Sequence, residues 1–156
     1  MNLTKGDKAP SFTLYASDKS EVSLSDYKGR NVVLLFFPLA FTSVCTKELC
    51  MTRDEIGIYG DLDADILAIS VDTVATLNKF NQENQFNFKL LSDFNKEVAR
   101  SYGCLYEEFG LGMRGVAKRS AFVIDRSGTI QYAEVLENAG KMPDFEKIKE
   151  KLSSLP

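Results

Sequence analysis

The sequence predicts an α/β fold, in which helices cover both faces of a central sheet. Apolar runs of strand length alternate along the chain with segments whose apolar residues recur every three or four positions. The runs Val32–Phe37 and Ile66–Val71 are apolar with almost no alternation, which is typical of strands buried on both faces. A chain of 156 residues can bury one such core but is too short to argue for two, so residues 1–156 are expected to form a single domain.

The N-terminal part is expected to form a short hairpin. The segments Phe12–Leu14 and Val22–Leu24 contain strand-forming residues, and the polar turn Ser17–Lys19 lies between them. The buried strand Val32–Phe37 comes next. Pro38 ends that strand, because a central strand needs the backbone N–H that proline lacks.

A first long helix is expected to begin at Thr42 or Ser43, either of which can cap it, and to run to about Gly60. One face of this helix would turn inward, since its residues recur at steps of three and four: Cys45, Leu49, Thr52, Ile56 and Tyr59. The strand Ile66–Val71 follows. Asp72-Thr73 then caps a second helix, whose inward face is formed by Val74, Leu77 and Phe80.

The second half of the chain continues this alternation. The expected elements are a third parallel strand at Phe88–Leu91, a short helix at Asn95–Tyr102, an antiparallel hairpin of Ser120–Ile124 and Thr129–Val135, and a last helix at Asp144–Leu152. The hairpin is predicted because Asp125–Gly128 is a turn sequence. The segment Tyr106–Lys118 is expected to be a mobile loop, because Gly110, Gly112 and Gly115 interrupt it.

Composition and charge exclude several classes of function. A net charge of −3 without a cluster of Lys and Arg argues against a nucleic-acid partner. No apolar run approaches the roughly 20 residues of a membrane-spanning helix. The first residues, Met1–Asp7, lack the apolar core of a signal peptide. A cytoplasmic protein without a membrane partner is therefore expected.

The chain has three cysteines and no histidine. An odd number of unevenly spaced cysteines is a poor disulfide framework and suits a reducing compartment. Without histidine there is no Cys-His or Ser-His-Asp site, and three cysteines are too few for a four-thiolate zinc site within one chain. We therefore expect neither a metal nor another cofactor, and the candidate chemistry depends on cysteine.

Cys45 follows the end of a buried strand, where ligand sites of open α/β sheets gather. With Thr42 as cap, Cys45 falls in the first helical turn. There, unpaired backbone N–H groups and the positive end of the helix dipole stabilise a negatively charged sulfur. Position alone leaves two interpretations open, a reactive thiol or a small buried residue of the core.

The sequence around Cys45 and several distant segments resemble a known family. Pro38, Thr42 and Cys45 match the P-x-x-x-T-x-x-C signature of the peroxiredoxins. Further segments look like this family in the expected order: Gly6–Leu14, Val33–Phe37, Glu48-Leu49, and Arg119–Asp125 followed by Gly128. The resemblance covers roughly residues 5 to 152. It implies a thioredoxin-like fold with a central mixed sheet and an N-terminal hairpin, and thiol peroxidase activity.

The resemblance also implies roles for individual residues. Cys45 matches the peroxidatic cysteine, whose thiolate attacks a peroxide and becomes a sulfenic acid. Thr42 matches the hydroxyl that orients the peroxide, and Pro38 matches the residue that shields the sulfur from water. Arg119 matches the guanidinium that supports thiolate and substrate, and Glu48 matches a carboxylate that hydrogen-bonds such an arginine. Glu48 and Cys45 are three residues apart on a helix, so one Arg119 could reach both.

Cys50 is the candidate resolving cysteine. Its spacing of five residues from Cys45 resembles the subgroup related to bacterioferritin comigratory protein, the Q type, in which a resolving cysteine can occupy this helix position. Five residues along an ideal helix place two Cα atoms roughly 8 to 9 Å apart. A disulfide needs about 4.4 to 6.8 Å. The first turns of the helix would therefore have to unwind before Cys45 and Cys50 could join.

Other features resemble the AhpE-like peroxiredoxins, of which some lack a resolving cysteine at this position. These features are Pro38–Thr42, Glu134–Leu136 and Met142–Phe145. In that alternative an external thiol completes the cycle. Cys104 matches no resolving position and is expected to be a core residue.

The resemblance implies a peroxide substrate, either hydrogen peroxide or an organic hydroperoxide, and thioredoxin or another thiol donor as reductant. It also implies either a monomer or a homodimer in which Leu39 and Phe41 meet a second copy.

Three alternative functions remain open. A thioredoxin-like disulfide reductase would need the C-x-x-C that is missing here, and a copper-binding assembly protein would want a histidine or methionine beside closely spaced cysteines. The third is a non-catalytic interaction domain, if Cys45 is unreactive.

Overall fold

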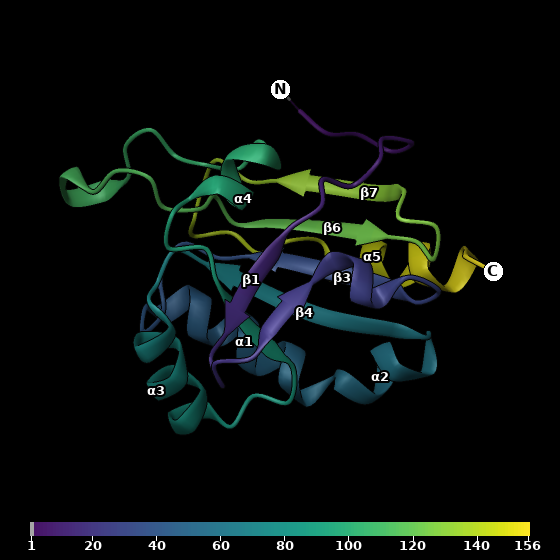
Figure 1. Ribbon diagram of the computed structural model, residues 1–156, viewed down its shortest axis with the longest axis horizontal. Coiled ribbons are helices and arrows are strands. Elements are labelled where there is room, and N and C mark those ends of the chain that lie inside the picture. The colour runs from purple at the N-terminus through teal and green to yellow at the C-terminus, as the bar shows by residue number, and fades with distance from the viewer. Residues whose placement is uncertain (1) are drawn as a thin grey trace.

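The computed structural model describes residues 2–156 and contains one central sheet with helices packed against it (Figure 1). The strands are β1 (Thr13–Ala16), β2 (Glu21–Ser23), β3 (Asn31–Phe36), β4 (Ala64–Ser70), β5 (Lys89–Ser92), β6 (Ser120–Ile124) and β7 (Ile130–Val135). They lie in the order β2-β1-β5-β4-β3-β6-β7. The pairs β3/β4 and β4/β5 are parallel and the others are antiparallel. The prediction of an α/β fold with a mixed, thioredoxin-like sheet and an N-terminal hairpin is confirmed.

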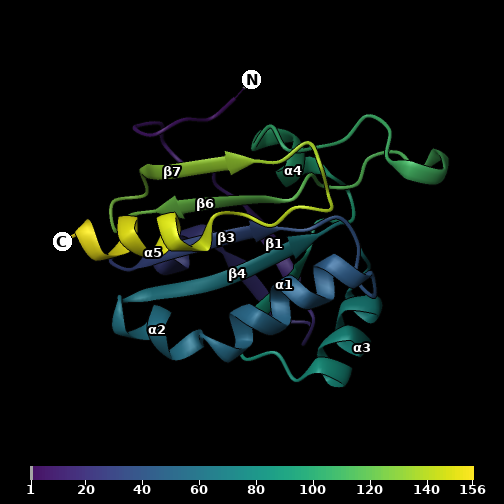
Figure 2. The ribbon, with the colours of Figure 1, turned by 180° about the vertical axis from the view of Figure 1, so that it is seen from behind.

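Helices cover both faces of this sheet unequally. They are α1 (Ser43–Asp54), α2 (Ile56–Asp61), α3 (Val74–Asn84), α4 (Glu97–Ser101) and α5 (Phe145–Ser154). One core lies beneath α1, α2, α3 and α5, which Figure 2 shows largely in front of the sheet, and the other core lies beneath α4 and the N-terminal segment. Successive residues of β3 contribute to the two cores in turn, as a period of two requires. The strand is therefore buried on both faces, as its uninterrupted apolar run predicts.

The expectation of one long helix running to Gly60 is wrong. The helix ends at Asp54, and Glu55, with φ −101° and ψ 11°, separates α1 from α2. The Glu55 carboxylate accepts a hydrogen bond from Lys149 of α5 at 2.9 Å, and two glycines, Gly57 and Gly60, weaken the helix beyond the break. Because Tyr59 of α2 still faces the core, the apolar spacing continues across the break and conceals it.

The segment Tyr106–Lys118 projects from the body of the molecule (Figure 1). It holds one turn of 3-10 helix at Gly110–Gly112 and is closed at its base by a bridge between Leu105 and Ala117. The mobility expected of this segment stays a prediction. Within residues 2–156, no helix combines the length and the apolar character that crossing a membrane requires.

The sheet brings two distant parts of the chain to the same edge. Phe36, at the end of β3, pairs with Ser120, at the start of the antiparallel strand β6. The loop that follows β3 and leads into α1 therefore lies next to Arg119, which directly precedes β6. Because β4 is parallel to β3, the loop after β4 also emerges at this edge.

Candidate active site

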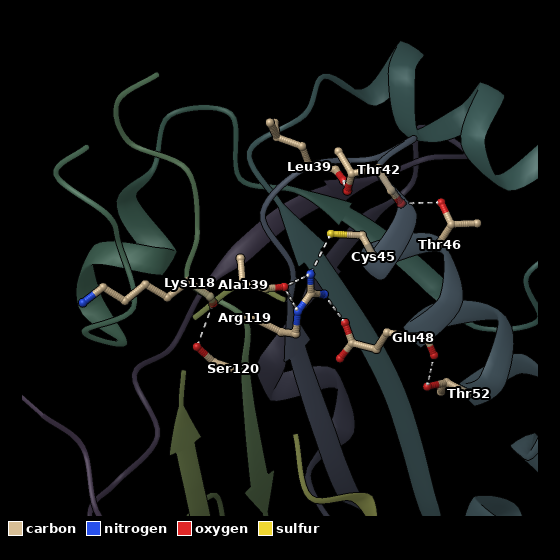
Figure 3. Close-up of polar contacts among 10 residues, drawn as sticks. All are labelled: Leu39, Thr42, Cys45, Thr46, Glu48, Thr52, Lys118, Arg119, Ser120 and Ala139. Atoms are coloured by element: carbon tan, nitrogen blue, oxygen red, sulfur yellow. Dashed lines mark hydrogen bonds and ion pairs between the residues drawn. The ribbon is translucent and has the colours of Figure 1, made fainter. Parts of the chain in front are cut away.

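The helix α1 begins at Ser43, and Thr42 occupies its N-cap position. The prediction that Thr42 occupies the N-cap is confirmed, but no side chain makes a capping hydrogen bond there. The Thr42 hydroxyl instead donates to the carbonyl of Leu39 at 2.7 Å (Figure 3). The N–H groups of the first turn therefore face the site without a capping side chain, and the lone pairs of the Thr42 hydroxyl stay able to accept a hydrogen bond.

Cys45 lies in the first turn of α1 on its inward face, with a side chain that is 1% exposed. Its sulfur is not enclosed by hydrocarbon alone, because Nη2 of Arg119 donates to Sγ at 3.2 Å (Figure 3). A cation and a helix N-terminus thus act on the same sulfur. Both place positive electrostatic potential at Sγ.

Arg119 is 1% exposed, and all three of its nitrogens have partners. Nη1 donates to Oε1 of Glu48 at 2.6 Å, and Nε and Nη2 donate to the carbonyl of Ala139 at 3.2 and 3.0 Å. Removal from water lowers the pKa of Arg119, but neighbouring Glu48 and Cys45 outweigh that effect and raise the pKa overall. The guanidinium is therefore a fixed positive charge held in one orientation.

Glu48 is fully buried one turn after Cys45, and its second oxygen, Oε2, has no hydrogen-bond partner. The pKa of Glu48 is raised from its ordinary value of 4.5 to about 7. Removal of the carboxyl group from water is the main cause, and the charge and hydrogen bond of Arg119 oppose it only in part. A single guanidinium is thus shared between a carboxyl group and a sulfur.

This arrangement makes the stability of the protein depend on pH. Since the folded-state pKa of Glu48 is raised from 4.5 to about 7, the folded state binds more protons than the unfolded chain in this range. The contribution of Glu48 to the free energy of unfolding is therefore fully present below pH 4.5 and is lost as pH rises through about 7. Glu48→Gln cannot titrate, so the free energy of unfolding of the wild type minus that of the variant should decrease over this range.

Urea unfolding of the two reduced proteins across the same pH range measures this difference. A difference that grows with pH would show that the ion pair with Arg119 outweighs burial.

The structure brings together four of the predicted site residues, namely Thr42, Cys45, Glu48 and Arg119 (Figure 3). Pro38 is buried in the loop between β3 and α1, two residues after the end of β3. Cys50 is half-buried elsewhere on α1, where its sulfur lies 3.6 Å from Oδ1 of Asn84 in α3. All three cysteines, Cys104 included, are free.

Cys104 belongs to the core on the opposite face of the sheet from Cys45. Removal from water raises the pKa of its thiol to about 12. Its position agrees with the expectation of a core residue, and such a thiol is unreactive.

Ala139 is a contact of Arg119 that the sequence did not reveal. Its carbonyl accepts from two nitrogens of the guanidinium, and no side-chain pattern announces a backbone acceptor. The only available signal is the turn around it, where Oδ1 of Asn138 accepts the N–H of Gly140 at 2.8 Å. This turn presents the carbonyl to the site.

Comparison with known proteins gives consistent matches. A family model described as the AhpC/TSA family matches residues 5–133. Alkyl hydroperoxide reductase E of Mycobacterium tuberculosis is 40% identical over 145 residues, which are 91% of this chain and 91% of that protein. Chloroplastic peroxiredoxin Q of Oryza sativa subsp. japonica is 36% identical over 130 residues, 83% of this chain and 58% of that protein. The crystal structure of peroxidoxin BcpB from Mycobacterium tuberculosis superposes with a TM-score of 0.88 at 29% identity and covers 99% of both chains.

Proposed function

The chain belongs to the AhpC/TSA family of peroxiredoxins, and we propose from this that it is a thiol peroxidase in which Cys45 reduces hydrogen peroxide and organic hydroperoxides. The observation that carries the proposal is the contact of 3.2 Å between Nη2 of Arg119 and Sγ of Cys45. It supports a thiolate at the N-terminus of a helix, which is the nucleophile that peroxide cleavage needs.

In the proposed reaction the thiolate of Cys45 attacks one peroxide oxygen while the O–O bond breaks. The sulfur is oxidised to a sulfenic acid, and the second oxygen takes the bonding electron pair and a proton and leaves as water or an alcohol. Thr42 would accept a hydrogen bond from the peroxide, and the first-turn N–H groups and Arg119 would stabilise the charge that develops. Pro38 would shield the sulfur from water.

Cys50 would then resolve the sulfenic acid as an intramolecular disulfide. The second half of α1 is anchored, since Nη1 of Arg53 donates to the carbonyl of Asn84 at 2.6 Å and Nδ2 of Asn87 donates to the carbonyl of Arg53 at 3.2 Å. The first turn has no capping side chain and leaves Phe41 and Thr42 exposed. These contacts favour unwinding that begins at Thr42 and brings Cys45 toward a nearly stationary Cys50.

The proposed partners of the protein are a peroxide substrate and a thiol reductant. A peroxide and a thiol reductant follow from membership of the family, and we propose a thioredoxin-like protein as the donor. If Cys50 does not resolve, an external thiol attacks the sulfenic acid directly. The single domain would act as a monomer or as a homodimer.

Oxidation mapping tests the peroxidase function. The fully reduced protein is mixed with an equimolar amount of hydrogen peroxide, quenched at intervals and analysed by mass spectrometry with a probe for sulfenic acid. We expect rapid oxidation at Cys45, and Cys104 serves as an internal control because burial makes it unreactive. Equal rates at these two cysteines, or none at Cys45, would contradict the proposal.

Replacing Cys50 by serine tests the resolving step. With peroxide alone, the wild type should accumulate a disulfide between Cys45 and Cys50, whereas Cys50→Ser should accumulate a sulfenic acid at Cys45 that persists. Turnover with a thioredoxin system should fall by about tenfold or more, because the internal thiol has a high effective concentration. Unchanged turnover, with Cys104→Ala as the matched control, would favour resolution by an external thiol.

A further inference from the structure

The peptide group between Leu39 and Ala40 is hydrogen-bonded at both of its polar groups. The N–H of Ala40 donates to Oδ2 of Asp72 at 2.8 Å. The carbonyl of Leu39 accepts from the Thr42 hydroxyl at 2.7 Å. A trans peptide is planar, and its N–H and C=O point in opposite directions, so a group that fixes the N–H also fixes the carbonyl. The carboxylate of Asp72 therefore determines where the Thr42 hydroxyl directs its proton.

Asp72 is itself held by the ends of two neighbouring strands. The Ser70 hydroxyl donates to the same Oδ2 at 2.7 Å, and the N–H of Asp72 donates to Oγ of Ser70 at 3.2 Å. The Ser92 hydroxyl donates to the carbonyl of Asp72 at 2.6 Å. Since Ser70 ends β4 and Ser92 ends β5, the carboxylate is fixed to the rigid sheet. The position of the Asp72 carboxylate is therefore set by the two strands and not by the loop that it contacts.

The loop between β3 and α1 needs such an anchor. Phe41 has φ 64°, a left-handed conformation that costs about 1 to 2 kcal/mol for a residue other than glycine. Phe41 is 49% exposed, and its ring packs against that of Phe80 at 5.1 Å between ring centroids, with the two planes tilted by 56°. Across residues 2–156, the bond from Ala40 to Asp72 is the one hydrogen bond that ties residues 38–42 to an element other than α1. The strained conformation is thus held by this one hydrogen bond, by the contact with Phe80 and by burial of the neighbouring Ala40 in the core.

We propose that Asp72 is a positioning residue for the peroxidase reaction, which acts on the Thr42 hydroxyl through the Leu39–Ala40 peptide. The inference rests on the proposed function. Hydrogen bonds in a chain polarise one another, so a carboxylate on the N–H makes the Leu39 carbonyl a stronger acceptor. The Thr42 hydroxyl then keeps its proton on that carbonyl and turns its lone pairs toward a peroxide. Asp72 makes no hydrogen bond to Cys45 or Arg119, so the sulfur keeps its own support.

Two rates measured on the reduced protein test this role. One is the oxidation of Cys45 by hydrogen peroxide, which needs the oriented hydroxyl, and the other is alkylation of Cys45 by iodoacetamide, which does not. In Asp72→Ala, oxidation should slow by about tenfold to a hundredfold while alkylation changes by less than about threefold. Asp72→Asn retains an acceptor oxygen and should recover most of the oxidation rate. Asp61→Ala, an exposed aspartate at the end of α2, is the control and should behave as the wild type.

A double-mutant cycle separates positioning from a general loss of structure. In a Thr42→Val background Asp72 has no hydroxyl to orient through the Leu39–Ala40 peptide. Adding Asp72→Ala should therefore slow oxidation by less than about threefold relative to Thr42→Val alone. If Asp72→Ala fails to fold, Ser70→Ala replaces it in the cycle, with a smaller slowing expected. Equal slowing of oxidation and alkylation, full additivity with Thr42→Val, or an oxidation rate in Asp72→Ala within about twofold of that of the wild type would overturn the inference. A wild type that peroxide does not oxidise would reject the proposed function itself.

Discussion

Replacing Cys45 by serine is expected to remove peroxide reduction almost completely, by at least about 10³-fold. The serine hydroxyl is nearly the size of the thiol, so α1 should fold as before, but an alcohol is a far weaker nucleophile than the sulfur it replaces beside Arg119. In the proposed mechanism, the remaining groups would still bind a peroxide but would supply no nucleophile. This variant therefore separates the chemistry of the sulfur from the architecture that surrounds it.

The measurement is peroxide consumption with a thioredoxin system, together with circular dichroism to establish folding. Cys104→Ala is the matched control, because that thiol lies in the core on the opposite face of the sheet. It should retain the peroxidase rate even if its stability falls. Residual activity in Cys45→Ser, or loss of activity in the control, would place the reactive thiol elsewhere.

Replacing Arg119 by methionine should have the second largest effect and should act on both rate and stability. Removing one charged donor from the reacting atoms costs about 10²- to 10³-fold in rate. Glu48 would at the same time be left as a buried carboxyl group without its partner, which costs about 3 to 5 kcal/mol in the free energy of unfolding. Arg119 lowers the pKa of Glu48 against the effect of burial, so its removal raises that pKa further, and a protonated carboxyl group in acid should make this loss of stability smaller.

The double variant Glu48→Met/Arg119→Met distinguishes the two losses. Replacing both members of a buried ion pair by apolar side chains of similar length is often nearly neutral for stability. We therefore expect most of the lost unfolding free energy to return while the peroxidase rate stays low. Arg119→Lys should also be slow, because one ammonium group cannot reach the sulfur, Glu48 and the Ala139 carbonyl together.

Denaturant unfolding and stopped-flow oxidation of Cys45 supply the two measurements. Recovery of the rate in the double variant would show that Arg119 acts only by neutralising Glu48. A rate in Arg119→Met close to that of the wild type would exclude the guanidinium from the reaction altogether.

The elements of the fold were predictable because each depends on local patterns. The apolar run at β3 requires burial on both faces, and the helical spacing of Cys45 and Leu49 requires an inward face on α1. The break at Glu55 was missed because the apolar spacing resumes in α2 and because its partner, Lys149, lies in a distant helix. Periodicity records which residues are buried and does not record where the helix axis changes.

Some features of the candidate site were likewise predictable from local sequence, and others were not. Local sequence places Cys45 at a helix N-terminus after a buried strand. The motif around it points to Thr42, and the resemblance of the distant segment Arg119–Asp125 to the family points to Arg119. The direction of the Thr42 hydroxyl, the Ala139 carbonyl and the Asp72 carboxylate came only with the structure. Each depends on a hydrogen bond that involves a backbone group, and a backbone group is the same in every residue type and leaves no trace in the sequence.

The sequence by itself therefore determined the class of fold, the position of Cys45 on its helix and the family to which the chain belongs. The tertiary structure alone decided how the groups around the Cys45 sulfur are oriented and held. The pairing of Phe36 with Ser120 brings Arg119 to Cys45 across 74 positions of sequence. Local composition constrains single elements, whereas the register between β3 and β6 is fixed by packing of the whole sheet, which no single segment encodes.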